Sequence, residues 1–346
     1  MKKGFRLGIA VFCCAWLAGC LALPANVAAE LDAARPGETN PYATRVPSNA
    51  IANATESARR TRRGVSLQDL PLASGQIVVM DDGDATGLFV SLFAEEYLPW
   101  SHVGIVVIEA DGPVIYDTNG GFFPVPGLPP TATFSGGMRR IPFIEYFSRQ
   151  KIIGVYSLPP EVDAGKIVAY VREQYARGTP FDPFFNNDDA SALYCAELVA
   201  LAKQAAGAAL IRQTPVRGNR SYAVLREWLQ IRTNGLYLPG QLADPMRQVA
   251  LWSADLTPTQ ITAYFEIRRE LTRRFDSRAR LGHLFQWTGK TLVLRDKPQR
   301  FVDATLTTFA TYTGNTDSVR KEVQRLANLY FSNDLPAGNS ASPVSR

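Results

Sequence analysis

A cysteine in the middle of the chain has surroundings that could make its thiol reactive. Cys195 begins the segment "CAELVALAKQAA", which consists of strong helix formers and follows the polar residues 186–191. We therefore predict that Cys195 lies in the first turn of a helix, where the helix dipole and a neighbouring imidazolium would favour a thiolate. Because the thiolate is the nucleophilic form, covalent acyl chemistry is indicated. The helix alone leaves open a buried, inert cysteine.

A histidine and an acidic residue could serve this thiol from one hairpin. His102 begins the apolar alternation "SHVGIVVI", and Asp117 follows in the next predicted strand. If the loop is 111–112, or the four residues 109–112, paired residue numbers sum to 223 or 221, and either sum places Asp117 on the face of His102. With 221, Asn119 lies directly opposite His102. We predict His102 as the base, Asp117 as the group that orients it, and Asn119 as the alternative third residue.

The elements that must position these residues are read from hydrophobic periodicity. A short strand is expected over 76–80, a loop beside a binding cleft over 121–138, a short helix and a strand within 141–159, and a helix over 161–178. Residues 256–331 are expected to be mostly helical. Their arginine-rich stretch, 266–283, is interpreted as a solvated helix face rather than a site for anionic headgroups.

The order of these motifs resembles the circularly permuted branch of the NlpC-type, papain-like cysteine amidases, in which histidine precedes cysteine. The likeness rests on "SH.G" in a strand, an acidic residue fifteen positions later, "G.PFD..F" and "YCAEL", within residues 72–245. It implies Cys195 as nucleophile, His102 as base and Asp117 as third member. Relatives carry Glu at the position of Asp117, which keeps Asn119 as the alternative.

The same resemblance implies the fold and the domain organisation. We expect an α+β, circularly permuted papain-like (NlpC-type) fold over residues 71–250, with an antiparallel sheet packed against the helix that bears the nucleophile. A mostly helical C-terminal lobe, 251–332, and a disordered tail, 333–346, would follow. The resemblance does not account for this lobe.

The N-terminus has the composition of an export signal. Residues 1–20, "MKKGFRLGIAVFCCAWLAGC", begin with basic residues and continue as an apolar run that is short for a membrane span. The ending Leu-Ala-Gly-Cys resembles a bacterial lipobox, which predicts a lipid anchor on Cys20, and the absence of Asp at position 21 favours the periplasmic face of the outer membrane. Cleavage after residue 29 would instead release a soluble periplasmic protein. Residues 21–70 are interpreted as a flexible tether.

Charge and cysteine usage exclude several function classes. The 346-residue chain has a formal net charge of +5, which falls to about +2 without the leader, so a nucleic-acid partner has little support. Cys13, Cys14 and Cys20 lie in the leader, so Cys195 has no disulfide partner. One cysteine and two histidines cannot supply the usual four ligands of a structural zinc ion. We expect no metal and no cofactor.

These observations predict a cysteine hydrolase of the bacterial envelope. It would be an amidase or peptidase, or an acyl-ester hydrolase or acyltransferase, and would form a thioester at Cys195. Its substrate would be a peptidoglycan peptide or a lipid acyl group. The alternative is a catalytically silent lipoprotein that binds lipid or peptidoglycan fragments in the same cleft. Tyr194 is interpreted as a packing residue, and Glu197 is assigned no chemistry.

Overall fold

The computed structural model describes residues 71–92, 97–122, 134–216, 226, 231, 233–253, 255–276, 281–288, 291–312 and 314–332. The predicted signal peptide, Cys20, the tether over 21–70 and the tail over 333–346 lie outside the described residues. Within the described part of the chain, no helix combines the length and the apolar character that a membrane span requires.

Six strands form one antiparallel sheet in the order β4-β3-β2-β1-β5-β8. The strands are β1 (Ile77–Asp81), β2 (His102–Glu109), β3 (Gly112–Phe122), β4 (Phe134–Pro142), β5 (Ile152–Tyr156) and β8 (Gln248–Ser253). Two small two-stranded sheets pair β6 (Thr214–Pro215) with β7 (Gly235–Leu236), and β9 (Phe285–Thr288) with β10 (Thr291–Leu294).

The helices complete an α+β fold, the class that the sequence predicted. They are α4 (Ala85–Ser91), α5 (Phe143–Arg149), α6 (Ala164–Arg177), α7 (Cys195–Ala205), α9 (Pro239–Leu242), α10 (Pro258–Asp276), α11 (Asp296–Thr308) and α12 (Thr316–Tyr330), with single 3-10 turns η3 (Pro245–Arg247) and η4 (Leu281–His283). Helix α6 begins where Asp163 accepts hydrogen bonds from two backbone N–H groups and ends at Gly178 in the left-handed conformation.

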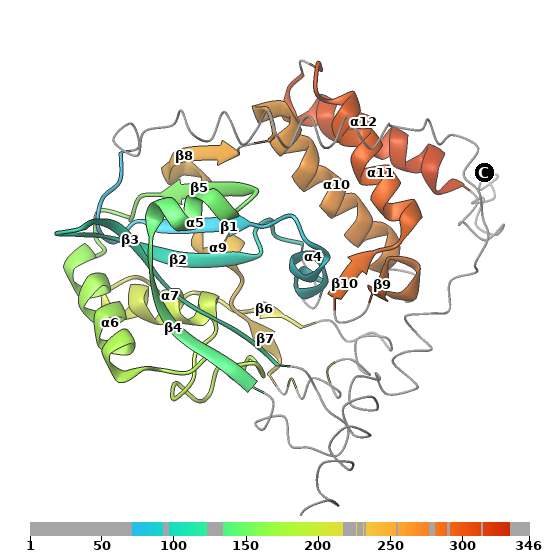
Figure 1. The fold of residues 1–346 in the computed structure, drawn as a ribbon. Helices are drawn as coiled ribbons and strands as arrows, with labels where there is room; N and C mark the ends of the chain where they lie inside the picture. Colours follow the sequence, from blue (N-terminus) through green and yellow to red (C-terminus); the bar gives the residue numbers. More distant parts are fainter. Residues whose placement is uncertain are drawn as a thin grey trace, which may run out of the picture.

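Strand alternation divides the core of the sheet into two faces. One face packs against α6 and α7, and the other buries Val106 and Ile115 against the α5 aromatic residues Phe143, Tyr146 and Phe147. Figure 1 shows α5 on one side of the sheet and α6 and α7 on the other. Burial on both faces makes the central strands a rigid support for residues at their ends.

The loop predicted over residues 121–138 is wrong at both of its ends, where the structure has strands β3 and β4. Residues 121–138 were expected to form a loop, but β3 extends to Phe122, and β4 begins at Phe134 and pairs with β3 along its length. Gly136 permits this pairing because its φ is +127° and a Cβ there would lie 2.4 Å from the Gly120 Cα. The glycines that suggested a loop instead allow two backbones to approach closely.

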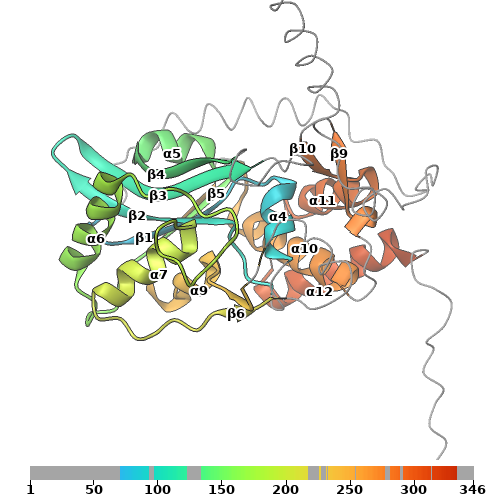
Figure 2. The ribbon, with the colours of Figure 1, turned by 90° about the horizontal axis from the view of Figure 1, so that it is seen from below.

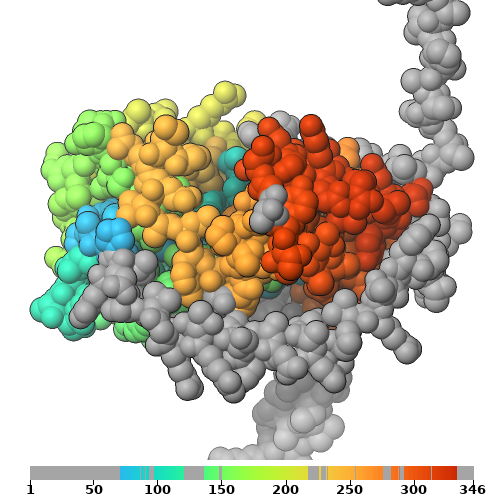
Figure 3. Space-filling model, turned by 90° about the horizontal axis from the view of Figure 1, so that it is seen from above, coloured from blue at the N-terminus to red at the C-terminus, as the bar shows by residue number. Residues whose placement is uncertain are grey.

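The C-terminal helices join the core of the sheet. One continuous apolar cluster includes β-sheet residues and also Phe301, Val323 and Phe331 from α11, α12 and the turn after it. The predicted boundary at residue 250 lies inside β8, which pairs with β5 in the main sheet. Figure 2 shows α10, α11 and α12 beside the sheet near α4, and Figure 3 shows the orange residues of β8 and α10 between the sheet region and the last helices.

A buried ion pair links the two parts. Arg268 of α10 lies 3.2 Å from the carboxylate of Asp81 at the end of β1, and the Tyr264 hydroxyl donates to the same oxygen at 2.7 Å. Both charged side chains are almost fully buried. The exposed arginines of α10 mostly pair with glutamates of the same helix, as Arg273 does with Glu270. Arg268 of the same stretch is buried, so the predicted solvated helix face is correct only in part.

Candidate active site

Cys195 is the first residue of α7, as the sequence predicted. No side chain caps this helix, so its first backbone N–H groups present the positive end of the helix dipole beside Cys195. The preceding residue, Tyr194, is buried. Its hydroxyl donates to Asn187 at 2.7 Å and accepts from the Tyr237 backbone N–H at 2.9 Å. These bonds anchor the backbone from which the half-buried thiol projects, consistent with the predicted packing role of Tyr194.

His102 and Asp117 meet across the hairpin. Glu109 pairs with Gly112 and Ile105 with Tyr116, so the paired numbers sum to 221, one of the two predicted registers. The Asp117 carboxylate then lies 2.8 Å from Nε2 of His102. The predicted proximity is confirmed, and it leaves Nδ1 as the ring nitrogen available to another group.

Gly104 makes this arrangement sterically possible. A Cβ at this position would lie 2.7 Å from the Ile115 side chain, 3.0 Å from the Tyr116 carbonyl oxygen and 3.2 Å from the Asp117 Cβ. The glycine of "SH.G" therefore provides the space in which the carboxylate lies beside His102.

Two residues that the sequence analysis missed complete the environment of Asp117. Arg139 of β4 donates to both carboxylate oxygens, at 2.9 and 2.6 Å, and the Tyr146 hydroxyl of α5 donates to Oδ2 at 2.9 Å. Burial disfavours the charged carboxylate, but His102 and Arg139 outweigh this effect and lower the pKa of Asp117 to about 2. Asp117 is therefore a fixed, fully buried negative charge behind the imidazole.

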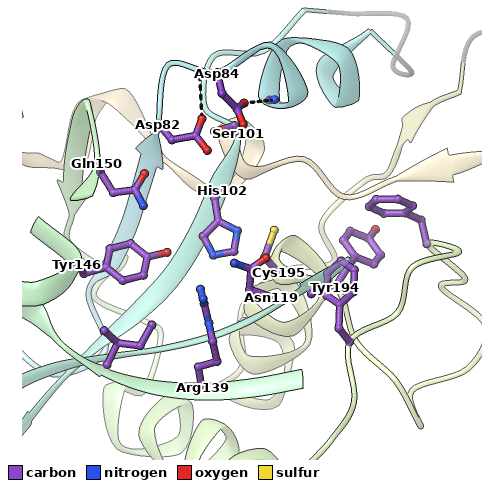
Figure 4. Close-up of a pocket in the computed structure, with 15 residues that line it drawn as sticks. Asp82, Asp84, Ser101, His102, Asn119, Arg139, Tyr146, Gln150, Tyr194 and Cys195 are labelled. Atoms are coloured by element: carbon purple, nitrogen blue, oxygen red, sulfur yellow. Dashed lines mark hydrogen bonds between the residues drawn. The ribbon is translucent and has the colours of Figure 1, made fainter. Parts of the chain in front are cut away.

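Figure 4 shows the His102 ring beside the sulfur of Cys195. Nε2 of the same ring is hydrogen-bonded to Asp117. Burial opposes a charged ring, yet the charge and hydrogen bonding of Cys195 and Asp117 prevail and raise the pKa of His102 to about 10. The imidazolium is then the form present at neutral pH. The charges alternate along this chain of contacts. The Arg139 cation pairs with the Asp117 anion, which pairs with the His102 cation, and His102 interacts with the thiol of Cys195.

These groups open onto a pocket of about 480 Å³. Its wall includes Cys195 and His102 and is mostly polar and aromatic: Asp82, Asp84, Ser101, His102, Asn119, Arg139, Ile141, Tyr146, Gln150, Phe181, Phe185, Tyr194 and Cys195. Asn119, the alternative third residue, is exposed in this wall, whereas Asp117 makes the contact with His102. Geometry thus favours Asp117 over Asn119 as the orienting group.

Backbone strain is concentrated beside the pocket. Among the described residues, the non-glycine residues with positive φ are Trp100, at +84°, and Phe185, at +53°. Trp100 lies two residues before His102 and packs edge-on against Phe265 of α10, with ring centroids 4.9 Å apart, while Phe185 lines the pocket. Such conformations are costly and persist where the surrounding packing imposes them.

The part of the chain that the structure describes contains no group of three or more His, Cys, Asp or Glu side chains that could hold a metal ion. The sequence matches no protein-family model and no curated protein. Among solved structures, the chain is similar to the metalloprotein YiiX from Escherichia coli O157:H7, with 14% sequence identity and a TM-score of 0.38, over 52% of this chain and 96% of that chain.

Proposed function

We propose that the chain is a cysteine hydrolase or acyltransferase with a circularly permuted, papain-like (NlpC-type) arrangement. The observation that carries the proposal is that the His102 ring is hydrogen-bonded to the buried Asp117 carboxylate and also interacts with the thiol of Cys195, beside which it lies in Figure 4. A nucleophile, a base and a group that orients the base are the parts that thiol acyl transfer requires.

In the proposed mechanism, the Cys195 thiolate attacks the carbonyl carbon of an amide or ester. The hydrogen bond between Nε2 and Asp117 turns Nδ1 of His102 towards the thiol, from where the imidazolium gives its proton to the leaving group. The thioester is then resolved when His102 takes a proton from water or another acceptor. Backbone N–H groups at the start of α7 would stabilise the oxyanion, an interaction whose loss typically costs about 10²-fold or more in rate.

In the proposed function, this reaction takes place in the bacterial envelope. Export and a lipid anchor on Cys20 would place the enzyme at the periplasmic face of the outer membrane, where peptidoglycan peptides and lipid acyl chains are the available substrates. The mixed lining of the pocket is compatible with a polar, peptide-like substrate as well as an ester.

The test is direct detection of the acyl-enzyme. The purified protein is incubated with p-nitrophenyl acetate, quenched in acid, and analysed by intact-mass and peptide mass spectrometry. We expect one acetyl group on the peptide that contains Cys195, no adduct in Cys195→Ala and strongly reduced formation in His102→Ala. Equal acetylation of wild type and His102→Ala, or none in a folded wild type, would instead favour the catalytically silent lipoprotein.

A further inference from the structure

A glutamate is buried in the first turn of the helix that begins with Cys195. Glu197 lies two residues after Cys195 in the first turn of α7 and is 1% exposed. Residues at positions i and i+2 of a helix do not face one another, so this side chain does not share the direction of the thiol. Among the described residues, its Oε2 has no hydrogen-bond partner. A buried polar atom without a partner is unusual and requires an explanation.

The charges around Glu197 are negative. Asp182, which is 4% exposed, and Asp189 belong to the loop that precedes α7, and both act on Glu197 electrostatically. Asp182 is itself held by the backbone N–H groups of Phe184 and Asn186. Two neighbouring buried carboxyl groups do not readily ionise together, and the one that accepts fewer hydrogen bonds retains its proton.

The other titratable groups that face this region come from the neighbouring elements. Tyr170 of α6 and Tyr194 at the start of α7 both interact electrostatically with Glu197. His102 and Asp117 lie on β2 and β3, which contact α7, but their side chains are on the other face of the sheet, against Tyr146 of α5. Burial and the negative charges of Asp182 and Asp189 raise the pKa of Glu197 to about 8, although the Tyr194 backbone N–H favours the carboxylate. At neutral pH the Glu197 side chain is therefore uncharged.

We propose that Glu197 is a positioning residue that acts in its protonated form, and that its ionisation suppresses acylation of Cys195 at alkaline pH. A neutral side chain leaves the positive end of α7 available to the thiolate and to the oxyanion. A carboxylate in the same place would oppose both negative charges in a poorly hydrated site. This inference rests on the proposed function and adds to it a regulation by proton uptake at the nucleophile helix.

The experiment compares wild type with Glu197→Gln, which keeps the shape and removes the charge. The burst rate with p-nitrophenyl acetate is measured from pH 6 to 9.5 after subtraction of the Cys195→Ala rate. We expect the wild-type rate to fall about tenfold or more as pH rises through 8, because one charge near a buried site has an effect of this order. Glu197→Gln should keep its plateau. Glu173→Gln, an exposed change on α6, should follow wild type.

A second readout reports the proton itself. Infrared difference spectra between pH 6.5 and 9.5 should contain the carbonyl band of a protonated carboxyl group that is absent from Glu197→Gln. The inference is overturned if that band is missing, if Glu197→Gln shows the same alkaline fall as wild type, or if folded Glu197→Gln loses acylation at every pH. Alkylation of Cys195 by iodoacetamide from pH 6 to 9.5 distinguishes a failure of the proposed function from a failure of this inference. Absence of acylation in every variant contradicts the proposed function, whereas identical alkylation profiles for wild type and Glu197→Gln contradict this inference.

Discussion

Asp117 is completely buried and lies 2.8 Å from Nε2 of His102, in a hairpin whose register places the two residues diagonally across neighbouring strands. Arg139 and Tyr146 occupy the remaining positions around the carboxylate, so it cannot turn away from the imidazole without loss of their hydrogen bonds. The orientation of the His102 ring is consequently determined by the main sheet and by α5, independently of any substrate.

Replacement of Asp117 by Asn should slow acylation strongly while the fold persists. The amide cannot hold the imidazolium as a carboxylate does, and it leaves Arg139 without its counter-charge. We expect a loss of roughly 10²- to 10⁴-fold in acylation rate, the contribution typical of general acid–base catalysis. Asp111→Asn, at the exposed turn of the same hairpin, is the matched control and should retain the wild-type rate. Comparable rates in both variants would exclude Asp117 from the reaction.

The free energy of unfolding should depend on pH through the pair His102 and Asp117. The pKa of His102 is raised from 6.5 to about 10, so its stabilising contribution is complete below pH 6.5 and disappears as pH rises towards 10. The pKa of Asp117 is lowered from 3.8 to about 2, so its contribution is present above pH 3.8 and is lost as pH falls towards 2. Urea unfolding of wild type and His102→Gln should therefore show a stability difference that shrinks between pH 6.5 and 10. A difference that grows over this interval would contradict the assigned charges.

Gly104→Ala should impair the site through geometry alone. The added methyl group has no room between Ile115 and Asp117 and must displace the carboxylate or separate the strands. We expect slower acylation and a destabilisation of about 1–3 kcal/mol, as is typical of overpacking. Thermal unfolding and burst kinetics measure the two effects. Wild-type values for both would show that the hairpin tolerates a side chain at this position.

Arg268→Ala should destabilise the whole chain and not only the C-terminal helices. Removal of one partner leaves the Asp81 charge buried and unpaired, which costs about 3–5 kcal/mol. The neighbouring Arg269→Ala is the control, because the Arg269 side chain is 44% exposed and its partner Glu266 keeps its ion pair with Arg320, so a loss of about 1 kcal/mol or less is expected. A single cooperative transition is expected in urea. Separate transitions, with only one of them shifted, would show that α10–α12 unfold independently.

Local patterns in the sequence were sufficient to locate the pair His102 and Asp117, because strand alternation and a short turn permit few registers. The start of α7 at Cys195 could be predicted from the run of helix-forming residues, although the N-cap is Tyr194 and no polar side chain of 186–191 caps the helix. Arg139 was missed because it directly follows the predicted loop 121–138 and was assigned to no element; only pairing with β3 makes this segment a strand. The contact between Asp81 and Arg268 joins residues 187 positions apart, and no local periodicity reports such a distance.

The reactivity of the Cys195 thiol towards iodoacetamide at pH 6 tests the central claim most directly. If His102 holds the sulfur as a thiolate, wild type should be alkylated much faster than the same thiol in the unfolded chain, and His102→Ala should be alkylated substantially more slowly than wild type. Equal rates for wild type and folded His102→Ala, or a wild-type thiol that is unreactive until the protein is unfolded, would contradict the proposed pairing of Cys195 with His102.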